Sequence, residues 1–162
     1  MSTYRWRCRL KRTNLIYLDV CCFNRPFDDQ SQLLIRMQTE AKLYIQDGIR
    51  QGAFDLVWSA ILDLENLANP DWDRRASIQA WRMLAKMDVA TTPSVETLAA
   101  GLAAGGVKPM DALHVASAIE AGASWFLTTD QALLRKMNHE SRLRVADPVD
   151  FIRALAESDS EN

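Results

Sequence analysis

Four acidic residues are placed where a metal site could form: Asp19, Glu65, Asp111 and Asp130. Three of the four border an apolar run, so we expect them at the edge of a strand or helix rather than on an open polar face. An acid at the carboxyl end of a buried strand, or in the first turn of a helix beside it, points into the crevice where open α/β sheets bind ligands. The pattern therefore predicts a carboxylate pocket that holds divalent cations.

The chemistry of such a pocket favours Mg²⁺ or Mn²⁺, because these hard ions prefer oxygen ligands over the sulfur and nitrogen ligands typical of zinc. The chain has only two histidines, and its three cysteines show no paired CxxC spacing. Crowded carboxylates raise one another's pKa unless cations neutralise them, so we expect the metal to stabilise the fold. One or two ions would polarise a scissile phosphate and lower the pKa of water, which is the chemistry of phosphodiester hydrolysis.

The composition is that of one soluble globular domain: 162 residues, 48% of them apolar, with a net charge of −2. This charge gives no overall basic footprint, so a nucleic-acid substrate would have to be met by metal ions and a local basic strip. The odd number of cysteines favours a reducing cytoplasm. The apolar run Leu15 to Leu18 is too short for a signal peptide or a membrane span, so we expect no membrane association.

Short apolar runs predict strands at 15–20, 54–58, 124–128 and 143–146, with an extended piece around Val89. Helical spacing predicts the helices that connect them: residues 29–50, a helix capped by Ser59 that stops near Asn69, a helix carrying Ile78 to Met87, residues 93–104, a helix opened by Pro109 with Asp111 in its first turn, and a last helix after Pro148. Strands that alternate with helices predict an α/β fold with three layers, in which helices flank a central parallel sheet.

The expected domain organisation is simple. Residues 1–13 form an irregular N-terminal extension or, alternatively, a basic arm for RNA phosphates. Residues 14–156 form the single domain, and residues 157–162 (ESDSEN) form a solvated tail.

Four stretches of the chain resemble the PIN-domain family over about residues 15–155: LIYLDVCCFNRPFDD, SAILDLENLANP, KPMDALHVASAIEAGASWFLTTD and RVADPVDFI. The most specific of them is the pattern PxDALHxAxAxxxGAxxxLTTD, from Pro109 to Asp130. The resemblance implies a nuclease fold with a central parallel sheet and an acidic pocket that binds Mg²⁺ or Mn²⁺. Many bacterial members of this family, the VapC-like toxins, cut RNA.

The resemblance assigns metal binding and catalysis to the same four acids: Asp19 after the first strand, Glu65 in the mid-chain helix, Asp111 at a helix start and Asp130 after a later strand. Many relatives have a serine or threonine directly after the first acid, whereas this chain has Val20, so Thr128 or Thr129 would have to orient the pocket alone. Asp63 precedes Glu65 by two residues and points to a different side of the same helix, which leaves it as the alternative mid-chain ligand.

The expected function is that of a metal-dependent endoribonuclease that hydrolyses RNA, as the toxin of a toxin–antitoxin pair or as a solitary relative. Its expected protein partner is a small antitoxin or a second copy in a homodimer, on the apolar surface of the helix at 29–50 and the one after it. The alternative is a non-catalytic PIN-like module that binds protein or RNA. A phosphoryl-transfer enzyme with Asp19 as nucleophile is a weaker rival, because Cys21 stands where a second acid is usual.

Other residues allow two interpretations each. His114 is a proton shuttle at the pocket or a structural histidine hydrogen-bonded to a neighbour, and the second is favoured. Arg25 contacts substrate phosphate or pairs with Asp28 or Asp29. Cys21 and Cys22 are expected to be small thiols buried behind a strand rather than a redox pair. Three tryptophans lie in apolar runs and are expected in the core: Trp58, Trp81 and Trp125.

Overall fold

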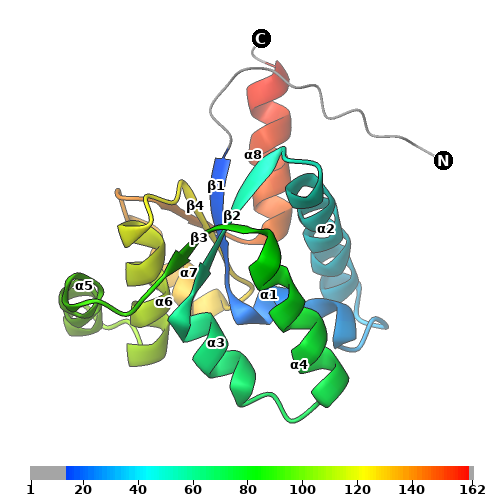
Figure 1. Ribbon diagram of the computed structural model, residues 1–162. Coiled ribbons are helices and arrows are strands. Elements are labelled where there is room, and N and C mark those ends of the chain that lie inside the picture. The colour runs from blue at the N-terminus through cyan, green and yellow to red at the C-terminus, as the bar shows by residue number, and fades with distance from the viewer. Residues whose placement is uncertain (1–13, 161–162) are drawn as a thin grey trace.

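The computed structural model describes residues 14–160, and a sheet of five strands in the order β3-β2-β1-β4-β5 forms its centre (Figure 1). The strands are β1 (Asn14–Leu18), β2 (Phe54–Ser59), β3 (Ala85–Val89), β4 (Trp125–Leu127) and β5 (Arg144–Ala146). Every pairing in this sheet is parallel, and Ile16 of β1 pairs with Leu56 on one side and Trp125 on the other. The predicted α/β class with a central parallel sheet is therefore confirmed.

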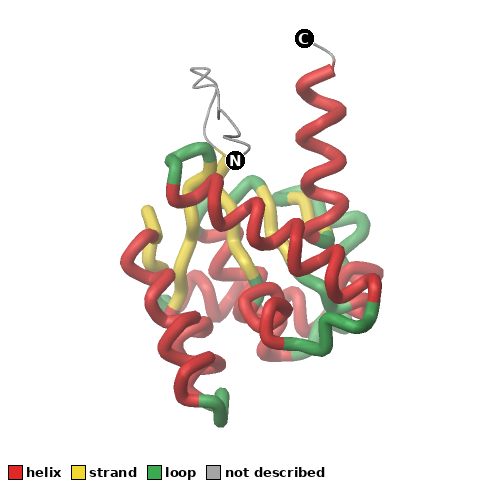
Figure 2. Tube along the Cα trace, turned by 90° about the vertical axis from the view of Figure 1, so that its right-hand side faces the viewer, coloured by secondary structure: helices red, strands yellow, loops and turns green. Residues whose placement is uncertain are grey.

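Helices cover both faces of the sheet. The helices are α1 (Val20–Asn24), α2 (Leu33–Arg50), α3 (Ala60–Leu67), α4 (Trp72–Gln79), α5 (Pro93–Ala104), α6 (Pro109–Glu120), α7 (Gln131–Lys136) and α8 (Pro148–Ser160), with 3-10 turns η1 (Arg25–Phe27) and η2 (Ala80–Leu84). One layer contains α2 and α8, which pack together, and the opposite layer contains α6 with α5 against it. Figure 2 looks onto the side of α2, with helices in front of the yellow strands.

The central strands are buried because they are covered on both faces, as a parallel sheet requires. Ile16, Tyr17 and Leu18 have no exposed surface. The ring of Tyr17 stacks on that of Phe126 with centroids 5.1 Å apart, which joins β1 to β4 in the core. The three tryptophans predicted to lie in the core are buried: Trp58, Trp81 and Trp125.

The strand order places a topological switch point between β1 and β4. From β1 the chain moves outward through β2 to β3 and then returns to the other side of β1 as β4. Because all strands are parallel, their carboxyl ends meet at one edge of the sheet, and ligands of open α/β sheets bind where the strand order reverses. Gly122 ends α6 with a φ of 74°, a left-handed conformation that glycine adopts without strain, and leads the chain into β4.

The long helix predicted for residues 29–50 begins only at Leu33, and residues 20–27 form two short turns, α1 and η1. These turns are too short to show helical periodicity, and the Asp19 side chain caps the first of them directly after β1. Leu33 and Leu34, assigned from their spacing to the apolar face, are 62% and 58% exposed. The buried apolar face of α2 starts at Ala41.

Two other boundaries differ from prediction. Met87 belongs to the edge strand β3 rather than to a helix, because the helical segment after Trp72 tightens into η2 and ends at Leu84. Residues 157–160 of the predicted tail are exposed, but they form the last turn of α8, since no glycine or proline interrupts it. Residues 1–13 and 161–162 lie outside the described residues. In the part of the chain that is described, no helix combines the length and hydrophobicity needed to cross a membrane.

A buried lysine on α2 lowers the stability of this fold. Lys42 is only 4% exposed, and its Nζ lies 5.7 Å from the centre of the Phe23 ring. None of the ion pairs among residues 14–160 includes it. Burial lowers the pKa of Lys42 to about 8, so the folded chain releases this proton at a lower pH than the unfolded chain does. The resulting destabilisation is complete below pH 8 and disappears as pH rises toward the ordinary lysine pKa.

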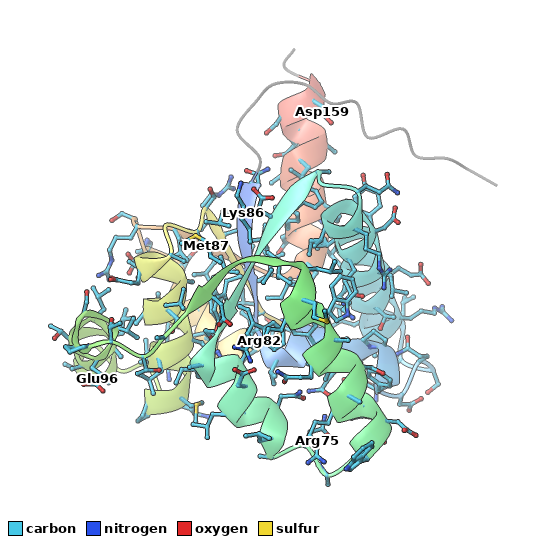
Figure 3. All side chains as sticks on the ribbon, in the orientation of Figure 1. Arg75, Arg82, Lys86, Met87, Glu96 and Asp159 are labelled. Carbon is cyan, nitrogen blue, oxygen red and sulfur yellow. The ribbon has the colours of Figure 1, made fainter. Side chains whose placement is uncertain are left out.

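We therefore expect Lys42→Met to stabilise the protein by about 1–3 kcal/mol at neutral pH and by much less at about pH 10. Urea unfolding at the two pH values measures the difference. Lys86→Met is the matched control, because Lys86 is exposed on β3 (Figure 3) and its surface pair with Asp55 contributes at most about 1 kcal/mol. Equal stabilisation by Lys42→Met at both pH values would contradict this account.

Candidate metal centre

Asp19 lies at the carboxyl end of β1, at the switch point, and is only 6% exposed. Its Oδ1 accepts the backbone N–H of Val20 at 2.8 Å, and its Oδ2 accepts the hydroxyl of Thr128 at 2.9 Å. Thr128 directly follows β4, so residues at the ends of two neighbouring strands hold this carboxylate in one orientation. Val20 has no hydroxyl to orient Asp19, and Thr128, one of the two threonines predicted for this role, donates the hydrogen bond instead.

Glu65 reaches the same place from α3. Its Oε2 is hydrogen-bonded to Nε2 of His114 on α6. Ligand atoms of Asp19, Glu65 and His114 all lie within 4.8 Å of one another. The structure therefore brings Glu65 next to the first-strand acid.

The alternative acid, Asp63, belongs to another network. Its Oδ1 accepts hydrogen bonds from Nε1 of Trp58 and Nε2 of Gln79, both at 2.8 Å, and its Oδ2 lies 3.5 Å from Nη1 of Arg82. These contacts fix α3 against β2, α4 and η2. Asp63 is thus engaged in packing, whereas Glu65 faces the other acids.

A buried chain of hydrogen bonds orients Glu65 from behind. The backbone N–H of Leu62 donates to Oγ of Ser59 at 3.2 Å, the hydroxyls of Ser59 and Tyr17 are 2.6 Å apart, and Tyr17 is 2.6 Å from Nδ1 of His114. Burial raises the pKa of Tyr17 well above its usual value, so its hydroxyl stays protonated and can donate to Nδ1. Nε2–H of the histidine then donates to Glu65.

This chain of contacts shows how His114 is held, and His114 is also the third member of the group whose ligand atoms lie within 4.8 Å. Both ring nitrogens are engaged, and the side chain is 1% exposed. The hydrogen bonds to Tyr17 and Glu65 are those of the favoured interpretation, a structural histidine bonded to its neighbours, and the role as a proton shuttle stays a prediction. Sequence reasoning missed Tyr17 and Ser59, because a tyrosine in an apolar strand and a serine before a helix have ordinary structural uses.

Asp111 and Asp130 complete the acidic cluster. Asp111 is partly buried in the first turn of α6, and its pKa is raised by burial first and then by the charges of Asp19 and Asp130. Asp130 caps α7 through Oδ1, which accepts the N–H groups of Ala132 and Leu133 at 2.9 and 3.2 Å. Asp111 is thus an electrostatic neighbour of Asp19, Glu65 and Asp130, and it lies outside the group whose ligand atoms are within 4.8 Å.

The cluster carries excess negative charge. Burial raises the pKa of Asp19, the Glu65 charge raises it further, and His114 and the Thr128 hydrogen bond lower it. No lysine or arginine within residues 14–160 forms an ion pair with Asp19, Asp111 or Asp130. Oxygen ligands about 2.1 Å from a cation lie about 3–4 Å from one another, so Asp19 and Glu65, whose ligand atoms lie within 4.8 Å together with one nitrogen of His114, need only small adjustments. The donor set fits Mg²⁺ or Mn²⁺.

A cleft of about 440 Å³ adjoins the cluster on the side of Glu65. Cys21 lines it, with Sγ 3.5 Å from Oδ2 of Asp19. The prediction that both neighbouring thiols lie buried behind a strand is therefore wrong for Cys21 and right for Cys22, which has no exposed surface. The reason is that α1 starts directly after Asp19, so that successive side chains point in different directions.

Arg25 and Arg74 are the arginines of this region. Of the two roles considered for Arg25, the structure shows the ion pair with Asp28, at 3.0 Å. Arg74 lines the cleft, and sequence reasoning missed it. No signal in the polar segment WDRRASIQ distinguishes it from its neighbours, because only the turn between α3 and α4 directs this helix toward the cleft.

Asp19 and Asp130 follow β1 and β4 at the switch point, the position expected for a ligand site in this class of fold, and the cleft adjoins them on the side of α3 and α4. Known protein families and curated proteins contain no match to this chain.

Proposed function

We propose that this chain is a metal-dependent endoribonuclease with a PIN-like fold, in which Asp19, Glu65, Asp111 and Asp130 bind Mg²⁺ or Mn²⁺. The observation that carries the proposal is the closeness of Asp19 and Glu65, whose ligand atoms lie within 4.8 Å at the switch point, with Asp111 close enough for its pKa to respond to their charges. No lysine or arginine within residues 14–160 pairs with Asp19, Asp111 or Asp130. A charge excess of this kind is costly to a fold unless it serves to bind a cation. An open cleft lined by Glu65 would give an extended strand access to the site.

The chain's own residues would divide the work. Asp19 is held rigidly by Thr128 and the Val20 N–H, as a principal ligand should be. Glu65 is oriented by His114 and remains 34% exposed, so it can reach both a cation and the cleft. Asp111 and Asp130 would complete the oxygen shell or order the attacking water. When bound, the divalent cation would neutralise charge on the scissile phosphate and lower the pKa of water.

We further propose that the chain acts in the cytoplasm as the toxin of a toxin–antitoxin pair. Free thiols at Cys21 and Cys22 suit a reducing compartment that contains RNA. Several large apolar side chains are exposed on α2, α3 and α4, which favours a protein partner such as a small antitoxin or a second copy of the chain: Leu33, Leu34, Met37, Leu64, Leu67 and Trp72.

The direct test is cleavage of single-stranded RNA with Mg²⁺, Mn²⁺ or EDTA. We expect cleavage only with metal, and a loss of at least about 100-fold in Asp111→Asn, because even groups that only support a metal ligand contribute about 10–100-fold. Asp63→Asn is the matched control and should retain activity, since Asp63 faces the packing contacts of α3. Unchanged cleavage by Asp111→Asn, or cleavage in EDTA, would overturn the proposal. Absence of any cleavage would favour the non-catalytic module that binds protein or RNA.

A further inference from the structure

The arginine in the cleft is fixed in place. Nη2 of Arg74 donates to the carbonyl oxygen of Phe27 at 3.1 Å, and its guanidinium lies 5.0 Å from the centre of the Phe27 ring. The two contacts tie α4 to the turn η1 across the cleft and hold the guanidinium beside the space that Glu65 also lines. An arginine held in this way loses little conformational freedom when it binds a ligand.

The Arg74 guanidinium also has N–H groups that no described residue accepts. Its Nε is covered by protein, but no hydrogen bond within residues 14–160 uses Nη1, and no acid there forms an ion pair with Arg74. Arg25 and Arg142, in contrast, bind Asp28 and Glu140 at 3.0 and 2.7 Å. A guanidinium without a carboxylate partner, at the wall of a cleft, is suited to a phosphate, which it can bind through Nη1 and the second N–H of Nη2.

Besides Arg74 and Glu65, the cleft is lined by amide and apolar side chains and by one further acid, Asp28. Asp28 is neutralised by Arg25. The Asn69 amide donates to Oδ1 of Asn24 at 3.4 Å, and the Asn24 amide donates to the carbonyl of Val20 at 3.2 Å. Each of these amides has a second N–H available. The volume of about 440 Å³ lies within the range of about 300–1,000 Å³ that is usual for small-ligand sites.

We infer that this cleft binds one nucleotide of single-stranded RNA beside the carboxylates, with its phosphate on Arg74 and its base or ribose near the amides of Asn24 and Asn69. An unpaired nucleotide is favoured because its base edge is free to meet such amides. The inference rests on the proposed function, since it takes RNA as the ligand. It adds a phosphate contact that depends on neither the metal nor the four acids.

The test measures binding rather than cleavage. A fluorescent single-stranded oligoribonucleotide is titrated by anisotropy in EDTA, at several salt concentrations, with the wild type, Arg74→Gln, Arg74→Lys and Arg75→Gln. We expect Arg74→Gln to bind about 10-fold more weakly and to reduce the slope of log K against log salt by about 0.7, the value for one phosphate contact on a single strand. Arg74→Lys should retain the slope, because it retains the charge.

Arg75→Gln removes the same charge from the next residue (Figure 3), whose guanidinium lies 5.9 Å from the Trp72 ring and does not line the cleft. It should bind like the wild type. Equal slopes for wild type and Arg74→Gln, equal losses in the two glutamine variants, or no binding by the wild type would each overturn the inference. RNA cleavage in Mn²⁺ by Arg74→Gln at the wild-type rate would overturn it while leaving the proposed nuclease intact. Conversely, if RNA binding depends on Arg74 but the wild type cleaves no RNA, the proposed nuclease is overturned and the inference stands.

Discussion

Asp19→Asn will abolish metal-dependent RNA cleavage and will at the same time make the metal-free chain more stable. The carboxylate is buried beside Glu65, and burial raises its pKa, so its charge destabilises the folded state when no cation is present. We expect cleavage to fall at least about 100-fold. We expect the melting temperature in EDTA to rise by about 2–4 °C, which corresponds to about 1 kcal/mol for a domain of this size.

The destabilisation by the Asp19 carboxylate should depend on pH. Because the pKa of Asp19 is raised in the folded state, the folded chain binds more protons than the unfolded chain between the ordinary value of 3.8 and the raised value. The stability of the metal-free wild type should therefore fall as pH rises through this interval, and the fall should be smaller in Asp19→Asn. Urea unfolding in EDTA between about pH 4 and pH 7 measures it.

Asp63→Asn serves as the control for both parts of this prediction. It makes the same chemical change in a carboxylate that accepts hydrogen bonds from Trp58 and Gln79, so it should not stabilise the chain. A lower melting temperature for Asp19→Asn than for the wild type in EDTA would contradict the prediction, because the Asp19 carboxylate would then stabilise the metal-free fold.

Saturating Mn²⁺ will raise the melting temperature of the wild type by about 5–10 °C over its value in EDTA. The reason is linkage: a ligand at 100 times its dissociation constant stabilises the folded state by about 2.7 kcal/mol, and each kcal/mol is worth about 2–4 °C here. The double variant Asp19→Asn/Asp111→Asn should show almost no shift, although it melts higher than the wild type in EDTA. A thermal scan in Mn²⁺, Mg²⁺ and EDTA measures all these values.

The matched control is again Asp63→Asn, which should retain the full shift with Mn²⁺. If the double variant shifted as much as the wild type, the cation would bind elsewhere on the chain, and the four acids would lose their assigned role.

The elements that could be predicted are those whose side chains face the core. The strands around Ile16, Leu56 and Phe126 are short apolar runs, and the parallel sheet follows from their alternation with helices. The start of α2 could not be found in this way, because Leu33 and Leu34 are spaced like core residues but are exposed. Spacing shows which residues share a helix face and not whether another element covers that face.

The candidate site was predictable to the extent that it depends on local position. Asp19, Asp111 and Asp130 stand at strand ends and helix starts, which the sequence marks with apolar runs, proline and threonine. The partners that orient Glu65 come from separate elements: Tyr17 is 97 residues from His114 in sequence. Arg74 reaches the cleft only through the turn between α3 and α4. Contacts of this kind depend on tertiary packing, which no local pattern reports.

The end groups of the RNA products test the central claim most directly. Water that attacks the phosphodiester and expels the 3′-oxygen leaves a 5′-phosphate and a 3′-hydroxyl, whereas attack by the ribose 2′-hydroxyl leaves a 2′,3′-cyclic phosphate. The account predicts 5′-phosphate products from the wild type in Mn²⁺, and none in EDTA or from Asp19→Asn. Cyclic phosphate ends formed equally in Mn²⁺ and EDTA would contradict it, because the carboxylate cluster would then have no part in the cleavage.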